Sequence, residues 1–232
     1  MAGRALILQH ERASIGSVPE WASERGFEVD VLMADEDWPV PSLEEVEFVV
    51  SMGSAAHTYH EVPWLAREYE VLAAAEAAAV PILGICFGSQ SLAVAHGGTT
   101  RPAREHEVDW LEVETLAPDL IPPGPWMFWH EDSFELPPDA ELLARTPVGP
   151  AAFRSGRSLA VQFHPEATLA AMESWLGAFR EELDPALAER LRRGMEAEPE
   201  QIVARAYALY DTFLALAGIE APVAGRPSQP VK

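Results

Sequence analysis

The sequence contains one cysteine, Cys86, and few basic side chains. A single cysteine cannot form an intramolecular disulfide, so a disulfide framework is excluded. Lys and Arg number 16 against 37 Asp and Glu, which gives the 232 residues a formal net charge of −21. Because phosphate groups are bound by clustered Lys and Arg, this balance argues against nucleic acid and anionic membranes as partners.

Long apolar runs are also missing. The most apolar window, residues 71–88, is interrupted by Glu76 and Pro81, which favours a helix end and a buried strand over a transmembrane helix. The apolar run at residues 5–8 is too short for a signal peptide. We therefore expect a cytoplasmic protein. No Gly-x-Gly-x-x-Gly motif or phosphate loop follows the first expected strand, and no cofactor is expected.

Strands and helices alternate over the first part of the chain. The expected strands are residues 5–9, 27–33, 48–51 and 80–85, and the expected helices are residues 18–25, 65–79 and 90–95. This order predicts an α/β fold with a doubly wound, mostly parallel, flavodoxin-like sheet. In such sheets the active site lies beyond the carboxyl ends of the strands.

The pattern changes in the second half of the chain. Short alternating runs joined by Pro-rich connections predict a small antiparallel β part, at residues 108–114, 126–130 and 151–154. Apolar stripes with a 3.6-residue period, at residues 169–183 and 202–214, predict C-terminal helices with core-packing faces. We expect one domain over residues 1–168, a helical extension packed on it over residues 169–217, and a disordered tail over residues 218–232.

The cysteine lies at the centre of the segment Gly84-Ile85-Cys86-Phe87-Gly88. Glycines two positions before and after it permit the sharp, strained turn that lifts a nucleophile above a sheet, as in the Gly-x-Ser-x-Gly elbow. A thiol at this place sits at a helix N-terminus, which favours the thiolate, and the Phe87 N–H can face a developing oxyanion. The alternative is a buried structural cysteine.

A second candidate segment is Ala160-Val161-Gln162-Phe163-His164-Pro165-Glu166. We expect a strand over residues 159–163 that ends in His-Pro-Glu. Residues two apart on an extended chain point to the same side, so Glu166 can orient the His164 imidazole. With Cys86 as nucleophile, His164 as base and Glu166 as orienting group, the two segments form a catalytic triad. The alternative for His164 is a surface histidine beside a turn.

These motifs resemble those of the class I, or triad, glutamine amidotransferases. Residues 84–90 are similar to the family elbow Gly-[Ile/Val]-Cys-x-Gly-x-Gln, and residues 161–166 contain its His-Pro-Glu motif. Phe48 to Ser54 stands where the family has its Gly-Gly-Pro oxyanion loop. His96-Gly97-Gly98 also fits, and Trp129 to Phe134 is similar to the family's His-x-Asp stretch. The likeness covers residues 4–168 and is closest to free-standing domains that resemble the glutaminase part of GMP synthetase.

The resemblance implies where substrate is held. It places the oxyanion donors at the N–H groups of Gly53 and Phe87, and the substrate pocket at Gln90, Trp129 and His130. The segment around His130 is expected to act through backbone contacts to glutamine. For Gln90 the alternative is simple packing at the helix N-terminus.

Some positions differ from the family pattern, and some histidines are considered as metal ligands. Met52 and Ser54 replace a Gly and the Pro of the usual loop, and Asp109 stands where relatives often carry Gly. His57 and His60 are three apart, but nothing pairs them at zinc-like spacing, so no metal is expected.

The resemblance implies hydrolysis of the γ-carboxamide of glutamine, to glutamate and ammonia, through a cysteine thioester. Three functions remain open. The protein is the glutaminase half of an amidotransferase that delivers ammonia to a partner synthase, a γ-glutamyl peptidase or hydrolase that uses the same triad, or a non-catalytic glutamine-binding protein.

Overall fold

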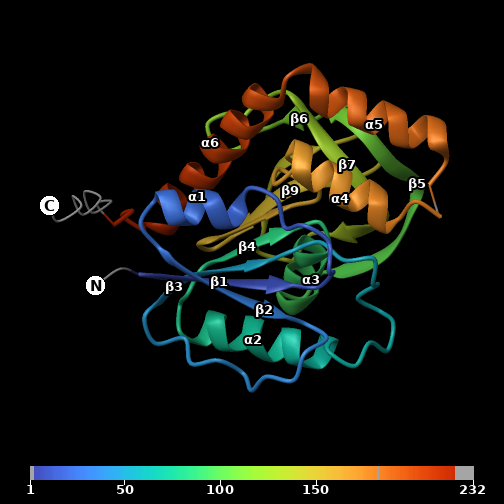
Figure 1. Ribbon diagram of the computed structural model, residues 1–232. Coiled ribbons are helices and arrows are strands. Elements are labelled where there is room, and N and C mark those ends of the chain that lie inside the picture. Colours follow the sequence, from blue (N-terminus) through green and yellow to red (C-terminus); the bar gives the residue numbers. More distant parts are fainter. Residues whose placement is uncertain (1–2, 182, 223–232) are drawn as a thin grey trace, which may run out of the picture.

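The computed structural model describes residues 3–181 and 183–222, and its centre is an eight-stranded sheet (Figure 1). The strand order is β2-β1-β3-β4-β10-β9-β8-β6, and the first five strands are mutually parallel. The other three continue the sheet in antiparallel pairs. In that order the strands are Glu28–Met33, Arg4–Gln9, Val46–Ser51, Ile82–Ile85, Ser158–Val161, Pro150–Ser155, Glu141–Arg145 and Glu114–Thr115.

Helices cover both faces of this sheet, because successive side chains of its parallel strands point to opposite faces and both sets are buried. Ala5 and Ile7 of β1 pack in one core with helices α1 and α6, whereas Leu6 and Leu8 pack in another with α2 and α3. Figure 1 shows α2 below the sheet, with α1 and α6 on the opposite side. These four helices are Val18–Glu24, Leu65–Ala77, Phe87–Ala95 and Pro199–Ala217 for α1, α2, α3 and α6.

A second sheet has two antiparallel strands, β5 (Thr99–Glu112) and β7 (Pro125–Glu135). Helices α4 (Leu169–Ala178) and α5 (Pro185–Ala197) pack against it and form a third apolar core. The predicted fold, a mostly parallel α/β sheet with a small antiparallel part and C-terminal helices, is confirmed.

Three details differ from the expectations. Helix α3 begins at Phe87, directly after the cysteine, rather than at Gln90. Residues 151–154 belong to β9 of the main sheet, not to the separate small one. Strand β10 ends at Val161, because the chain then turns away from the sheet and the His164 N–H donates to the Met127 carbonyl of β7 at 2.7 Å.

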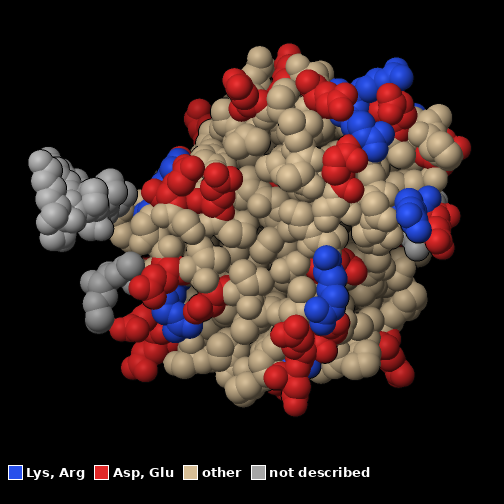
Figure 2. Space-filling model, viewed as in Figure 1, with Lys and Arg blue, Asp and Glu red and all other residues tan. Residues whose placement is uncertain are grey.

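Acidic side chains outnumber basic ones on the face drawn in Figure 2. Many of the arginines lie beside a carboxylate, as Arg25 does with Asp211 and Arg192 with Glu173. Within the described residues, no helix is both long and apolar enough to cross a membrane. Helix α6 ends at Ala217, its C-cap residue Gly218 adopts the left-handed conformation, and most of the tail expected at residues 218–232 lies outside the described residues.

Candidate active site

The carboxyl ends of β1, β3, β4 and β10 meet at one pocket of about 260 Å³. The sheet order reverses between β1 and β3, and such a switch point is where open α/β sheets bind ligands. Residues from all of the predicted site segments line this pocket, among them Gly53, Cys86, Gln90, Trp129, His130, His164 and Glu166.

Cys86 occupies a sharp turn between β4 and α3. Its backbone has φ 52° and ψ −107°, a conformation that costs a non-glycine residue free energy and persists only where the surrounding structure imposes it. Its N–H donates to the Val161 carbonyl at 2.8 Å. A Cβ at Gly84 would lie 2.6 Å from the Gly88 carbonyl oxygen, and one at Gly88 would lie 2.0 Å from the Ser51 carbonyl oxygen. The two glycines of the elbow are therefore required by close backbone packing.

The thiol of Cys86 is 4% exposed and points to β7, where its Sγ donates to the Trp129 carbonyl over 3.6 Å. Phe87 is the first residue of α3, and the N–H groups of a first helical turn have no intrahelical acceptor. The thiol therefore lies beside a helix N-terminus, as the elbow sequence predicts.

His164 and Glu166 meet side by side, with Nδ1 and Oε1 2.8 Å apart. The side chains are 11% and 2% exposed. Burial lowers the pKa of His164, but the charges of Glu166 and Cys86 and the hydrogen bond to Glu166 outweigh burial and raise the pKa well above 6.5. The two residues pair across a turn at residues 165–166 and not along the extended chain that the sequence analysis expected there.

Gly53 lies against both Cys86 and His164. A Cβ added there would be 3.0 Å from His164 Cε1 and 3.6 Å from Cys86 Cβ. The Met52 backbone is fixed on both sides, since its N–H donates to Leu8 and its carbonyl accepts from Gly88, each at 3.1 Å. The structure thus brings Gly53, Cys86, His164 and Glu166 together in the pocket lining, and Phe87 directly follows Cys86 at the start of α3.

Comparison with known proteins identifies the family. A family model described as glutamine amidotransferase class-I matches residues 16–179. The chain belongs to this family.

The relatives agree with this assignment. The chain is 34% identical over 137 residues to the glutamine-hydrolyzing GMP synthase of Ralstonia pickettii (strain 12J), a match that covers 52% of this chain and 24% of that protein. The chain therefore spans about a quarter of the length of that relative. A glutamine amidotransferase from Thermotoga maritima superposes with a TM-score of 0.84 at 25% identity, covering 92% of this chain and 99% of the other. One from Methylobacillus flagellatus shares the fold, with a TM-score of 0.85 at 20% identity over 93% and 96% of the two chains.

In this class I glutamine amidotransferase, a carboxylate bonds the loop after β3. Glu11 Oε1 accepts from the Ser54 hydroxyl and from the Ala55 N–H, both at 3.0 Å. Ser54 Oγ in turn accepts from the Ala56 N–H at 3.0 Å. Hydrogen bonds therefore hold the loop at the place where the family's usual proline would restrict it.

Gln90 and His130 join the elbow helix to β7. The Gln90 amide donates to the Asp132 carbonyl and to Gln162 Oε1, each at 3.3 Å, and its side chain is 3% exposed. The His130 ring uses both nitrogens inside the protein, with the Asp132 carbonyl at 2.8 Å and Glu107 at 3.1 Å. Both ring nitrogens of His130 therefore have partners inside the protein.

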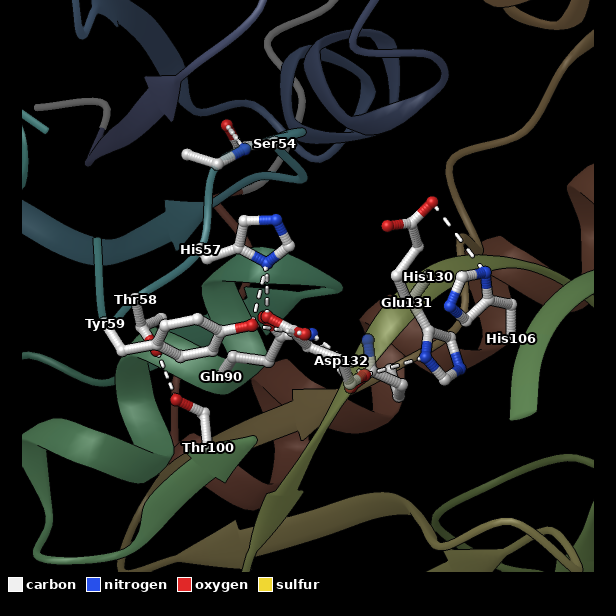
Figure 3. Close-up of polar contacts among 12 residues, drawn as sticks. Ser54, His57, Thr58, Tyr59, Gln90, Thr100, His106, His130, Glu131 and Asp132 are labelled. Carbon is white, nitrogen blue, oxygen red and sulfur yellow. Dashed lines mark hydrogen bonds and ion pairs between the residues drawn. The ribbon is translucent and has the colours of Figure 1, made fainter. Parts of the chain in front are cut away.

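Figure 3 shows a polar wall that the sequence analysis missed. Asp132 accepts from Tyr59 at 2.9 Å, and its second oxygen lies 2.6 Å from His57 Nδ1. Burial of the Tyr59 hydroxyl and, to a smaller extent, its hydrogen bond to the Asp132 carboxylate raise the pKa of Tyr59 to about 12. The sequence signal for this cluster was Asp132, the acidic residue of the His-x-Asp stretch. His57 was considered only as a metal ligand.

Helix α4 supplies an aromatic wall. The Trp175 ring lies 5.3 Å from the His164 ring, and Phe179 lies 5.4 Å from Trp129. Trp175 Nε1 donates to the Ser14 carbonyl at 2.7 Å, which closes the pocket between α4 and the loop after β1. Trp175 and Phe179 belong to the stripe that the sequence assigned to packing, and they line the pocket as well.

Asp109 lies away from the pocket lining. Its carboxylate accepts from Arg190 Nε at 2.8 Å and so ties β5 to α5. In residues 3–181 and 183–222, no group of three or more His, Cys, Asp or Glu side chains is placed to hold a metal ion.

Proposed function

We propose that this protein hydrolyses the γ-carboxamide of glutamine to glutamate and ammonia through a thioester on Cys86. The observation that carries the proposal is the common pocket shared by the strained Cys86 turn, the His164–Glu166 pair and Gly53. Nucleophile, base and orienting group within one pocket are the recognised arrangement for acyl transfer.

In the first half of the reaction, His164 takes the Cys86 proton on Nε2, since Nδ1 is held by Glu166. The sulfur attacks the γ-carbonyl carbon, and the N–H groups of Gly53 and Phe87 receive the oxyanion. Each such donor typically contributes about 2.7–4 kcal/mol to stabilisation of the transition state. When the intermediate collapses, the carbon–nitrogen bond breaks and the His164 proton leaves with ammonia. The raised pKa of His164, which favours the imidazolium, suits this step.

In the second half, His164 takes a proton from water, which attacks the thioester carbon. The carbon–sulfur bond then breaks, glutamate leaves, and the proton returns to the Cys86 sulfur. Glu166 acts through His164 by fixing the tautomer and orientation of the ring.

We assign recognition of the amino-acid end of glutamine to the opposite wall of the pocket. Gln90 braces β7, so that the backbone of Trp129 and His130 is presented beside the Cys86 thiol. The carboxylates of Glu11 and Asp132 line the same pocket, and their charge suits an α-ammonium group.

The test is stoichiometric. The purified chain with L-glutamine should release glutamate and ammonia in equal amounts, and Cys86→Ser should release neither above background. Equal rates for the two proteins would show that the thiol is not the nucleophile. A useful control is Ser23→Ala, because Ser23 is an exposed residue of α1 outside the pocket lining; it should retain the wild-type rate.

A second candidate, hydrolysis of γ-glutamyl peptides by the same triad, is favoured by the aromatic wall. Trp129, Trp175 and Phe179 offer apolar surface to a leaving group larger than ammonia. We expect free glutamine to be hydrolysed slowly and γ-glutamyl dipeptides no faster. A preference for the peptides of more than about tenfold in kcat/KM, or about 1.4 kcal/mol, would establish the second candidate instead.

We also propose that the ammonia is used by a synthase, by analogy with the glutamine-hydrolyzing GMP synthases to which this chain is similar. Co-purification of a synthase, together with a faster glutaminase rate in its presence, would support this assignment. An unchanged rate with a co-purified synthase would contradict it.

A further inference from the structure

A buried carboxylate outside the triad bonds Ser51, which leads to Gly53, and the His10 ring, which packs against Phe87. Glu68 of α2 is 2% exposed. Its Oε1 accepts from the Ser51 hydroxyl at 2.6 Å, and its Oε2 lies 2.9 Å from His10 Nε2. The proposed reaction gives Glu68 no direct part.

Both partners of Glu68 adjoin the active site. Ser51 is the last residue of β3 and directly precedes Met52 and Gly53. Its carbonyl fills the place where Gly88 has no side chain, since a Cβ there would be 2.0 Å away. Any movement of Ser51 is therefore transmitted to the loop on one side and to the elbow helix on the other.

His10 makes the second connection. It follows β1, lines the pocket, and has a fully buried side chain. Its ring meets Phe87 edge-on with centroids 5.1 Å apart, and stacks on Trp64 at 4.9 Å. The ring that Glu68 holds thus packs against the residue whose N–H is the second proposed donor.

We propose that Glu68 is a positioning residue that sets the spacing between the Gly53 and Phe87 N–H groups. The assignment rests on the proposed function for the role of those groups. A buried charged acceptor forms stronger hydrogen bonds than a neutral one, and leaving such a charge without its partners is costly. A shift of Ser51 would break a bond to this carboxylate, and a shift of Phe87 would disturb its packing on the His10 ring, so Glu68 favours one arrangement of the two before substrate binds.

The test uses Glu68→Gln and Ser51→Ala, with Glu70→Gln as the matched control because Glu70 is exposed on the same helix. The amide keeps the volume of Glu68 but replaces one acceptor oxygen, whereas Ser51→Ala removes one hydroxyl. A 1 Å error in placement can cost about a hundredfold, so we expect kcat for glutamine to fall about tenfold to a hundredfold in Glu68→Gln. KM should stay within about threefold.

Alkylation of Cys86 by iodoacetamide separates positioning from general damage. This reaction displaces iodide and forms no oxyanion, so its rate should change less than about twofold in Glu68→Gln while kcat falls. Parallel losses of kcat and of alkylation would overturn the proposal and indicate a merely structural role. Unchanged kcat in both variants would also overturn it.

Hydrogen exchange at residues 52–56 tests the positioning role of Glu68 without relying on glutaminase activity. Exchange of these amides should quicken in Glu68→Gln and Ser51→Ala but not in Glu70→Gln, with the β4 amides unaffected. If the wild type released no ammonia, the proposed function would fail, while faster exchange would still support Glu68 as the group that positions the loop. Unchanged exchange would reject the positioning role whatever the activity.

Discussion

Gly53→Ala tests the proposed oxyanion hole at the point where the structure leaves least room. The added methyl would lie 3.0 Å from His164 Cε1 and 3.6 Å from Cys86 Cβ. Carbon atoms normally approach to about 3.5–4.0 Å, so the loop or the imidazole must move by about 0.5 Å. Gly53 is not among the residues with positive φ, so the substitution acts through contact and not through backbone strain.

The expected fall in kcat follows from the free energy that one oxyanion donor contributes to transition-state stabilisation. One oxyanion donor contributes about 2.7–4 kcal/mol, or about 10²–10³ in kcat. A partial displacement should remove part of this, so we expect kcat for glutamine to fall about tenfold to a hundredfold. KM should change less, because the N–H acts on charge that develops in the transition state.

The assay is steady-state ammonia release, with melting temperature measured in parallel. Gly177→Ala is the control, because Gly177 is an exposed residue of α4 and a Cβ there meets nothing within 4 Å. That change should leave kcat unaltered and stabilise the helix by up to about 1 kcal/mol. If Gly53→Ala kept kcat within about twofold of wild type with an unaltered melting temperature, the Gly53 N–H would not be an oxyanion donor.

Three further predictions concern the triad. A diazo-ketone analogue of glutamine should label the wild type at one equivalent and Cys86→Ser not at all by intact mass, and equal labelling would reject the nucleophile. His164→Ala should remove nearly all turnover, whereas Glu166→Gln should leave a measurable rate, because an orienting group contributes less than the base; turnover of His164→Ala within tenfold of wild type would refute the triad. An NMR titration, assigned with His164→Gln, should give a His164 pKa above 6.5 that Glu166→Gln lowers. Because the folded-state pKa is raised, this group stabilises the fold fully below about pH 6.5, and that stability is lost as pH rises through the folded pKa.

The parts of the site that local sequence encodes could be predicted before the fold was known. The Cys86 turn was visible from its two glycines, and the structure shows that both prevent backbone clashes. The approach of His164 and Glu166 was also predictable from their spacing, although a turn and not a strand produces it. The alternation of strands and helices sufficed for the fold, because the periodicities of the two elements differ.

Contacts between distant loops could not be predicted. Asp132 meets His57 and Tyr59 because β7 passes beside the loop after β3, and no period in the sequence encodes that meeting (Figure 3). The apolar stripe of α4 predicted burial but not what it would be buried against. Trp175 is 8% exposed and packs in the third core, and it also closes the pocket beside His164.

The loop after β3 has a consequence for any requirement for a partner. Glu11 holds the far end of this loop through Ser54 and Ala55, and Glu68 holds its near end through Ser51. Both contacts lie within this chain, so we expect the Gly53 loop to be held in place before any other protein binds. A synthase that increases the rate would therefore act on steps other than formation of the hole, such as closure over the aromatic wall or removal of ammonia. We accordingly expect the isolated protein to hydrolyse glutamine at a low but measurable rate.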